Sequence, residues 1–244
     1  MKNKNFMAME KLASESGSKD LARLKSFPSR FASLILEYLP NSKSQLRQDI
    51  FALVQSDFKH GGYFVEFGAT NGKDRSNSYL LEKDFGWTGI LAEPAKLWHD
   101  ELELNRSCVI SHNCVWVKSG SEIEFTECDY AELSTITSFA DKDIHAEKRQ
   151  LSQKYKVTSI SLIDLLERNN APKVIDFLSI DTEGSEFEIL KAFDFSKYKF
   201  NSIVCEHNYG STREQVFQLL VSKGYTRVYE DISDFDDWYI LRTE

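Results

Sequence analysis

The stretch Val65-Glu66-Phe67-Gly68-Ala69-Thr70-Asn71-Gly72 has the pattern of a buried strand that ends at a glycine turn carrying a carboxylate. A second acidic strand end follows at Glu93, where a nucleotide-binding fold reaches for a ribose. Asn71 and Gly72 allow the positive-φ turn that close packing against a cofactor requires. The stretch therefore predicts a site for an adenosyl cofactor.

Two further runs of sequence end in carboxylates. Residues 86–94 close with Glu93 and Pro94, and the apolar run 174–181 closes with Asp181. In an open parallel sheet the ligand lies at the carboxyl ends of the strands, so ends that are far apart in the sequence can meet in one crevice. Because β and α patterns alternate, we expect an α/β fold with a mainly parallel sheet. The terminal pair 225–229 and 238–242 predicts one reversed edge strand.

The charge beside the glycine turn favours one cofactor over another. A dinucleotide fold leaves backbone amides free for a pyrophosphate, with no carboxylate beside the anion. Here Glu66 lies two residues before Gly68. A carboxylate there repels a pyrophosphate, but it accepts a bond from the ammonium of an amino-acid moiety or lies near a sulfonium. This favours S-adenosylmethionine, and an NAD-dependent oxidoreductase stays open as the alternative.

The composition is that of an ordinary globular protein. The chain has 244 residues, of which 41% are hydrophobic and 28% charged, and this fits one α/β domain with an appendage. A net charge of −8 without clustered lysine and arginine argues against a nucleic-acid partner. We find neither a signal peptide nor a transmembrane segment, and we expect reduced cysteines and a cytoplasmic location.

Residues 1–43 differ in pattern from the rest of the chain. Residues 1 to about 25 are polar and predict a mobile tail. From Phe27 to Leu39 apolar residues recur at helical spacing, which predicts an amphipathic helix that ends at Pro40. We expect it to pack on its own domain; a contact in a homo-oligomer, with another partner or with a membrane is the alternative.

Residues 44–244 are expected to form the main domain. Within it, residues 126–156 follow no strong period. A segment of this length without a pattern of its own is often a lid or a binding loop. We therefore expect it to cover the site or to bind the second substrate, a small molecule or a glycan.

Several motifs in a fixed order give the chain a resemblance to a known family. They are Phe64-Val-Glu-Phe-Gly-Ala-Thr-Asn-Gly72, Ser76-Asn77, Leu81-Glu82-Lys83, Gly86-Trp-Thr-Gly-Ile-Leu-Ala-Glu-Pro94 and Ile180-Asp-Thr-Glu-Gly-Ser-Glu186. Over about residues 44–242 the chain resembles the FkbM family of S-adenosylmethionine-dependent methyltransferases. The resemblance implies a Rossmann-like methyltransferase fold with seven strands, the last one reversed, and helices on both faces. It also implies O-methylation of a hydroxyl on a sugar, glycan or natural product.

The resemblance further implies a set of cofactor-binding residues. Glu93 would hold both ribose hydroxyls, because a carboxylate accepts two charge-assisted hydrogen bonds well. Asn113 would contact the adenine edge, and Asp181 would lie beside the methyl group and the acceptor. The remaining residues belong to the two cofactor motifs: Glu66, Gly68, Ala69, Asn71, Gly72 and Pro94.

Methyl transfer to a hydroxyl also needs a group that accepts the hydroxyl proton. His207 follows a β-rich run and accepts protons near neutrality, so we expect it to be the base, with Asp181 and Glu183 beside it. A histidine bonded to the backbone at a strand end stays open. A divalent ion on Asp181, Glu206 and Asn208 is the alternative way to activate the hydroxyl, although we expect no metal. A non-catalytic interaction module is the last alternative.

Overall fold

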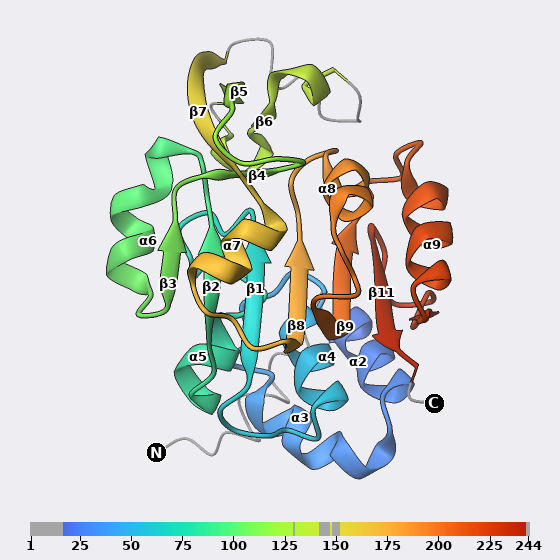
Figure 1. Cartoon of the computed structure of the whole chain (residues 1–244). Coiled ribbons are helices and arrows are strands. Elements are labelled where there is room, and N and C mark those ends of the chain that lie inside the picture. The colour runs from blue at the N-terminus through green and yellow to red at the C-terminus, as the bar shows by residue number, and fades with distance from the viewer. Residues whose placement is uncertain (1–16, 129, 142–146, 148–151, 243–244) are drawn as a thin grey trace.

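A seven-stranded sheet forms the centre of the computed structural model, which describes residues 17–128, 130–141, 147 and 152–242 (Figure 1). The strand order is β10-β11-β9-β8-β1-β2-β3. All pairs from β9 to β3 are parallel, whereas β11 is antiparallel to both of its neighbours. The strands are β1 (Tyr63–Phe67), β2 (Thr88–Ala92), β3 (Val109–Ser111), β8 (Val174–Ile180), β9 (Lys199–Glu206), β10 (Tyr225–Val228) and β11 (Asp236–Leu241).

This arrangement confirms the mainly parallel α/β sheet and the reversal of the last strand. The predicted terminal pair is present, with Tyr225 opposite Leu241 and Val228 opposite Trp238. The reversed strand lies one place inside the predicted edge, because β11 inserts between β9 and β10. The outer strand β10 therefore runs in the same direction as β9.

Helices cover both faces of the sheet because successive strand residues point to opposite sides. Phe64 lies in one core and its neighbour Val65 in the other. On the face of the sheet where Val65 lies, residues of α7, α8 and α9 complete the hydrophobic core. On the face where Phe64 lies, residues of α3, α4 and α5 do so. None of the described helices is long and apolar enough to cross a membrane. The helices are α2 (Gly17–Ser26), α3 (Ala32–Tyr38), α4 (Gln48–Gln55), α5 (Tyr79–Phe85), α6 (His99–Asn105), α7 (Leu162–Arg168), α8 (Glu186–Ala192) and α9 (Arg213–Ser222), with short 3₁₀ turns η1 (Ser29–Phe31), η2 (Lys96–Trp98), η3 (Ala131–Leu133) and η4 (Thr137–Phe139).

The N-terminal segment packs on the domain. The prediction of a mobile tail is wrong for residues 17–25, which lie in α2, and residues 1–16 of that prediction lie outside the described residues. Arg47 of the main domain donates two hydrogen bonds of 2.9 Å to the buried carboxylate of Asp20 and so fixes α2. The helix predicted from Phe27 to Leu39 is shorter, comprising η1 and α3. Its apolar face enters the core with Phe31 and Ile35, which confirms packing on its own domain.

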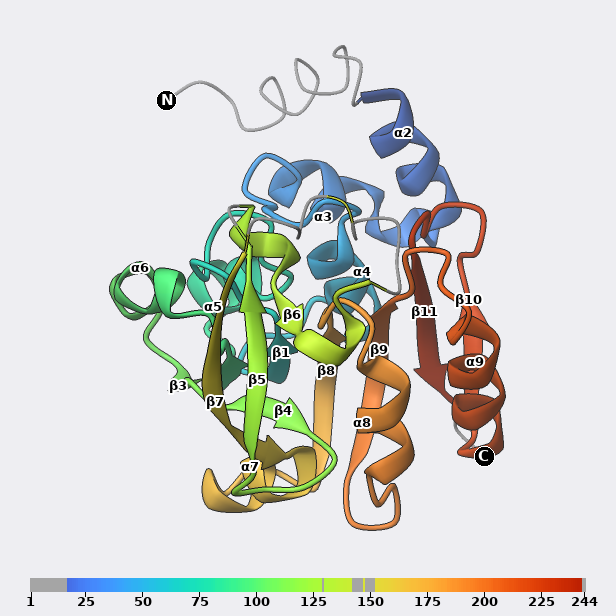
Figure 2. The same cartoon turned by 90° about the horizontal axis from the view of Figure 1, so that it is seen from above.

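A second, four-stranded sheet lies over the carboxyl ends of the parallel strands (Figures 1 and 2). Its order is β4-β7-β5-β6, with β4 (Cys114–Trp116), β5 (Glu122–Glu127), β6 (Thr135–Ile136) and β7 (Gln153–Ser161). The chain leaves the main sheet after β3 and joins the second sheet as β4. The described part of 126–156 is built from the end of β5, η3, β6, η4 and the start of β7.

Candidate functional site

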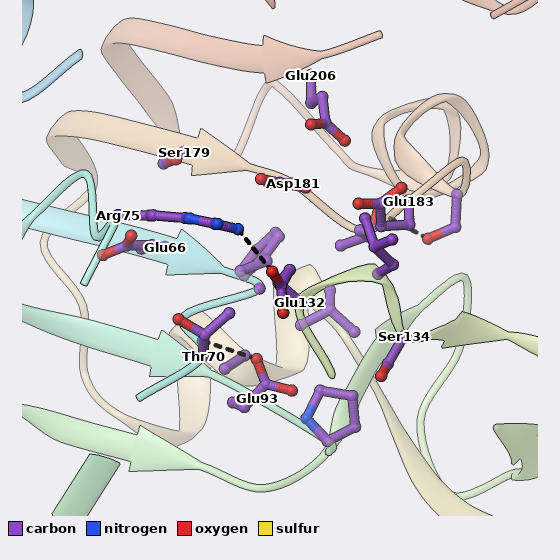
Figure 3. Close-up of a pocket in the computed structure, with 18 of the residues that line it drawn as sticks. Glu66, Thr70, Arg75, Glu93, Glu132, Ser134, Ser179, Asp181, Glu183 and Glu206 are labelled. Atoms are coloured by element: carbon purple, nitrogen blue, oxygen red, sulfur yellow. Dashed lines mark hydrogen bonds and ion pairs between the residues drawn. The ribbon is translucent and has the colours of Figure 1, made fainter. Parts of the chain in front are cut away.

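A cavity of about 400 Å³ lies between the ends of the parallel strands and the second sheet (Figure 3). Its volume is in the range of small-molecule sites. Strand ends supply one wall, and η3, β6 and their neighbours supply the other. The polar lining residues include Gln45, Glu66, Thr70, Arg75, Asn77, Glu93, Glu132, Ser134, Ser179, Asp181, Glu183, Glu206 and Asn208.

Gly68 brings the ends of β1 and β8 together. It has φ +71°, and a Cβ atom at this position would lie 2.0 Å from the carbonyl oxygen of Asp181. Its amide donates a 3.1 Å hydrogen bond to the carbonyl of Ala92 at the end of β2. Only glycine allows both the positive φ and the close approach of the Asp181 backbone. Gly68 and Asp181 therefore line the same cavity, as predicted from the two acidic strand ends.

Glu93 lines the cavity at the end of β2. Its two oxygens accept 2.8 Å hydrogen bonds from the amides of Thr70 and Ala95, and its side chain is buried. Burial raises the pKa of Glu93 to about 7, although the two backbone hydrogen bonds lower it. Each carboxylate oxygen has a second lone pair, so Glu93 can still accept from a ligand hydroxyl. Pro94 also lines the cavity.

Asp181 and Glu206 form a hydrogen-bonded pair of acids at the ends of β8 and β9. The register that places Ile180 opposite Cys205 sets these two residues side by side, and their carboxyl groups share a hydrogen bond. Burial raises the pKa of Asp181 to about 6 and that of Glu206 well above its usual value, and the neighbouring charges of Asp181 and Glu183 raise the latter further. Near neutral pH, Glu206 therefore holds the proton and donates it to the Asp181 carboxylate.

Glu183 completes an acidic group with this pair. One carboxylate oxygen of each of Asp181, Glu183 and Glu206 lies within 4.8 Å of the others. Figure 3 shows all three at the same end of the cavity. Carboxylate oxygens are the donors that magnesium and calcium bind, so this group fits a hard divalent cation as well as a shared proton. Either a bound cation or a shared proton would reduce the repulsion among these three carboxyl groups.

Glu66 lines the cavity, but other groups of the chain occupy its oxygens. It accepts hydrogen bonds from the Ser76 hydroxyl at 3.0 Å, from the Asn77 amide at 2.7 Å and from the Ser78 hydroxyl. The Arg106 guanidinium lies 3.9 Å away. These contacts fix the loop that follows the glycine turn. The expected contact between Glu66 and a cofactor ammonium must compete with all of them.

Four of the expected cofactor residues do not line this cavity: Ala69, Asn71, Gly72 and Asn113. Asn71 organises the turn, because its side-chain oxygen accepts from the amides of Lys73 and Asp74. Gly72 lies against α6, where a Cβ atom would approach Leu102 to 2.5 Å. Asn113 faces the second sheet and donates to the carbonyl of Thr158 at 3.3 Å. Asn71 and Gly72 thus shape the turn after β1, and the cofactor contacts expected of all four residues stay predictions.

His207 lies outside the cavity that contains Asp181. It lines a second cavity together with Trp116, Phe139 and Phe187, whereas its neighbours Glu206 and Asn208 line both. Its Nδ1 accepts a hydrogen bond from the Tyr209 amide at 3.0 Å, and its Nε2 is 3.7 Å from Asp237. Burial lowers its pKa. The structure therefore brings Glu183 to Asp181, as expected, but not the His207 ring.

Sequence reasoning missed two residues that line the cavity from the loop before α5. Arg75 extends from the loop and forms a 2.9 Å ion pair with Glu132 of η3 on the opposite wall (Figure 3). Asn77 donates from Nδ2 to Ser179 on β8 at 2.9 Å. The sequence offered one indication of them: an arginine and an asparagine between the glycine turn and the next helix.

Comparisons with known proteins give a family match and similar solved structures. A family model described as the methyltransferase FkbM domain matches residues 66–239. The comparison with curated proteins gives no match.

Two solved structures have a similar chain path. A precorrin-6y C5,15-methyltransferase from Geobacter metallireducens GS-15 is 10% identical, with a TM-score of 0.44 over 80% of this chain and 87% of that chain. A TehB-like SAM-dependent methyltransferase from Corynebacterium glutamicum ATCC 13032 Kitasato is 7% identical, with a TM-score of 0.41 over 88% of this chain and 97% of that chain. The family match, rather than these structures, is the basis of the assignment that follows.

Proposed function

The chain belongs to the FkbM family of S-adenosylmethionine-dependent methyltransferases, and from that premise we propose that it methylates a hydroxyl oxygen of a sugar, glycan or natural product. One observation supports this proposal most directly. The turn at Gly68 packs against Asp181, so the ends of β1 and β8 meet Glu93 of β2 in one cavity. In an open parallel sheet this crevice is the position of a nucleotide ligand.

Glu93 would hold the ribose of the cofactor, because its free lone pairs can accept hydrogen bonds from two hydroxyl groups, and these bonds favour the ionised form of the carboxyl group. Cys114, Val115 and Phe125 form an apolar part of the lining that would receive the adenine. Asp181 and the carboxylates beside it would attract the positive charge of the sulfonium, which supplies the activated methyl group when the cofactor is bound.

The acid pair supplies the base in this proposal. The acceptor oxygen attacks the methyl carbon in line with the carbon–sulfur bond, which breaks and leaves a neutral thioether. The hydroxyl proton passes to the Asp181 carboxylate, whose pKa of about 6 suits proton transfer near neutrality. Alignment in the cavity supplies several kcal/mol of the barrier reduction. His207 has no role in this step, since its ring lies in the other cavity.

The charge of the lining indicates which acceptors fit. Glu132, Glu183 and Glu206 lie in the wall together with the carboxylates already described, whereas Arg75 is the one lysine or arginine among the described lining residues. An acceptor with a phosphate or carboxylate would meet like charge here. The proposed acceptor is therefore neutral or cationic, and residues 130–136 of η3 and β6 cover it.

Calorimetry with S-adenosylhomocysteine and with NAD⁺ tests the cofactor. We expect the protein to bind the former and not the latter; the reverse result would support an oxidoreductase. Extract incubated with methyl-labelled S-adenosylmethionine and the protein then reveals the acceptor, and labelling must disappear in Asp181→Asn. Equal labelling by Asp181→Asn and wild type would refute the proposed base. Failure of both to label any compound, with intact cofactor binding, would support the interaction-module alternative.

A further inference from the structure

Two residues of the loop before α5, Arg75 and Asn77, line the cavity with polar groups that can bind a ligand. Among the described residues, the Asn77 side-chain oxygen has no hydrogen-bond partner, although Asn77 is only 8% exposed. An unpaired buried acceptor is costly, so a native structure with one usually has a ligand or water for it. Since Asn77 lines the main cavity, a ligand bound there can supply the missing donor.

Arg75 is the second residue with this capacity. It extends from the side of the cavity where Ser179 and Glu66 lie toward Glu132 of η3 (Figure 3). Its backbone is held in place by a β-bridge to Ser44, outside the segment that the family model matches. The Arg75 and Glu132 side chains are 54% and 31% exposed, so the ion pair between them is weak and can exchange partners.

Glu66 cannot easily serve the same purpose. It already accepts from two hydroxyl groups and one amide, and a guanidinium lies beside it. An ammonium that approached it would have to displace one of these buried donors. By contrast, the Asn77 oxygen needs no displacement.

We propose that Arg75 and Asn77 form a subsite for an α-amino-acid group, namely the methionine end of the cofactor. Arg75 exchanges Glu132 for the carboxylate, which its planar fork binds through two parallel hydrogen bonds. The Asn77 oxygen accepts from the ammonium. Ser179 holds the Asn77 amide and lies two residues before Asp181 on β8, so the subsite adjoins the place of the sulfonium. This inference rests on the proposed function and specifies how the cofactor is held.

Four ligands separate the two contacts in calorimetry: S-adenosylhomocysteine, its decarboxylated analogue, its deaminated analogue and 5′-methylthioadenosine, which has no amino-acid group. Arg75→Gln should weaken the binding of S-adenosylhomocysteine about tenfold and the binding of the decarboxylated analogue less than about twofold. Only S-adenosylhomocysteine has the carboxylate whose charged hydrogen bonds are lost. Asn77→Leu should weaken the binding of both of these ligands, which carry the ammonium, but not the binding of the deaminated analogue. Equal loss for all four ligands in either variant would overturn that contact.

Glu132→Gln tests the exchange without removing either subsite residue. It releases Arg75 from its partner, so S-adenosylhomocysteine should bind at least as tightly as to wild type; weaker binding would overturn the exchange. Lys156→Ala removes a 2.8 Å exposed ion pair with Glu122 on the second sheet and serves as the matched control, with no effect expected on any ligand.

The wild-type protein alone also gives an answer if a variant fails to fold. It should prefer S-adenosylhomocysteine over 5′-methylthioadenosine by about tenfold or more, because only the former reaches the subsite. Equal affinity for the two would overturn the subsite and leave the proposed function intact. Binding of neither would overturn the proposed function itself.

Discussion

Gly68→Ala should destabilise the protein and deform the site, because this position combines a positive φ with a close backbone approach. Gly61 offers a matched control. Its φ is +72°, against +71° at Gly68, but an added Cβ atom there meets nothing within 4 Å. At Gly68 the same atom would lie 2.0 Å from the Asp181 carbonyl oxygen, which is backbone and cannot rotate away.

The two substitutions separate the backbone cost from the steric cost. The left-handed conformation costs an alanine about 1 kcal/mol at either position. Overlap with a packed neighbour adds about 1–3 kcal/mol, and this term applies at Gly68 alone. We therefore expect Gly68→Ala to lower the free energy of unfolding by about 2 kcal/mol more than Gly61→Ala does.

Urea unfolding of both variants measures this difference, and calorimetry with S-adenosylhomocysteine measures the effect on the site. Since β1 must move away from Asp181, binding should weaken at least about tenfold in Gly68→Ala and remain unchanged in Gly61→Ala. Equal stabilities of the two variants, or unchanged affinity in Gly68→Ala, would refute the role assigned to the close approach of the two strand ends.

Three further predictions follow from the charges of the site. The carboxyl groups of Glu93 in the site and of Asp236, which is buried behind it at the start of β11, have folded pKa values of about 7, above their unfolded values near 4, because both are buried. The folded state therefore binds more protons between these values, and the free energy of unfolding should fall by about 2 kcal/mol or more from pH 5 to pH 8, then level off; a rise over this range in urea titrations would contradict it. Glu93→Ala should weaken the binding of S-adenosylhomocysteine by about 1–3 kcal/mol, because charged hydrogen bonds to the ribose are lost, and an unchanged dissociation constant would contradict the ribose contact. Turnover should survive both EDTA and His207→Asn, since the proposed base is Asp181; loss with EDTA that magnesium restores would assign the acidic group to a metal instead.

The sequence predicts best where strand ends determine the outcome. Gly68, Glu93 and Asp181 meet in one cavity because parallel strands place their carboxyl ends at the same edge, and this follows from the alternation of β and α patterns. The same rule applies to Glu206, which ends the strand next to that of Asp181. Because Asp181 and Glu206 end neighbouring strands, the hydrogen bond between their carboxyl groups could have been predicted from the sequence.

The errors arise where a side chain's direction or partner depends on tertiary contacts. His207 is one residue beyond Glu206, and this single step turns its ring into the other cavity. Glu66 has the expected position, but its donors come from the loop before α5 and from Arg106, and their approach is set by packing. The second sheet was missed because β7 pairs two segments that the sequence does not mark as neighbours, β4 and β5.

The bridge between Ser44 and Arg75 bears on where this protein can be shortened. A polypeptide trimmed to the span of the family model would start at Glu66, inside β1, and would lack α4 and the apolar face of α3. It would also lose Ser44, whose β-bridge holds the backbone of Arg75, and Gln45, which lines the cavity. Since Asp20 of α2 also accepts from Arg47, we expect a fragment for expression, crystallisation or domain grafting to need the residues from Gly17 onward.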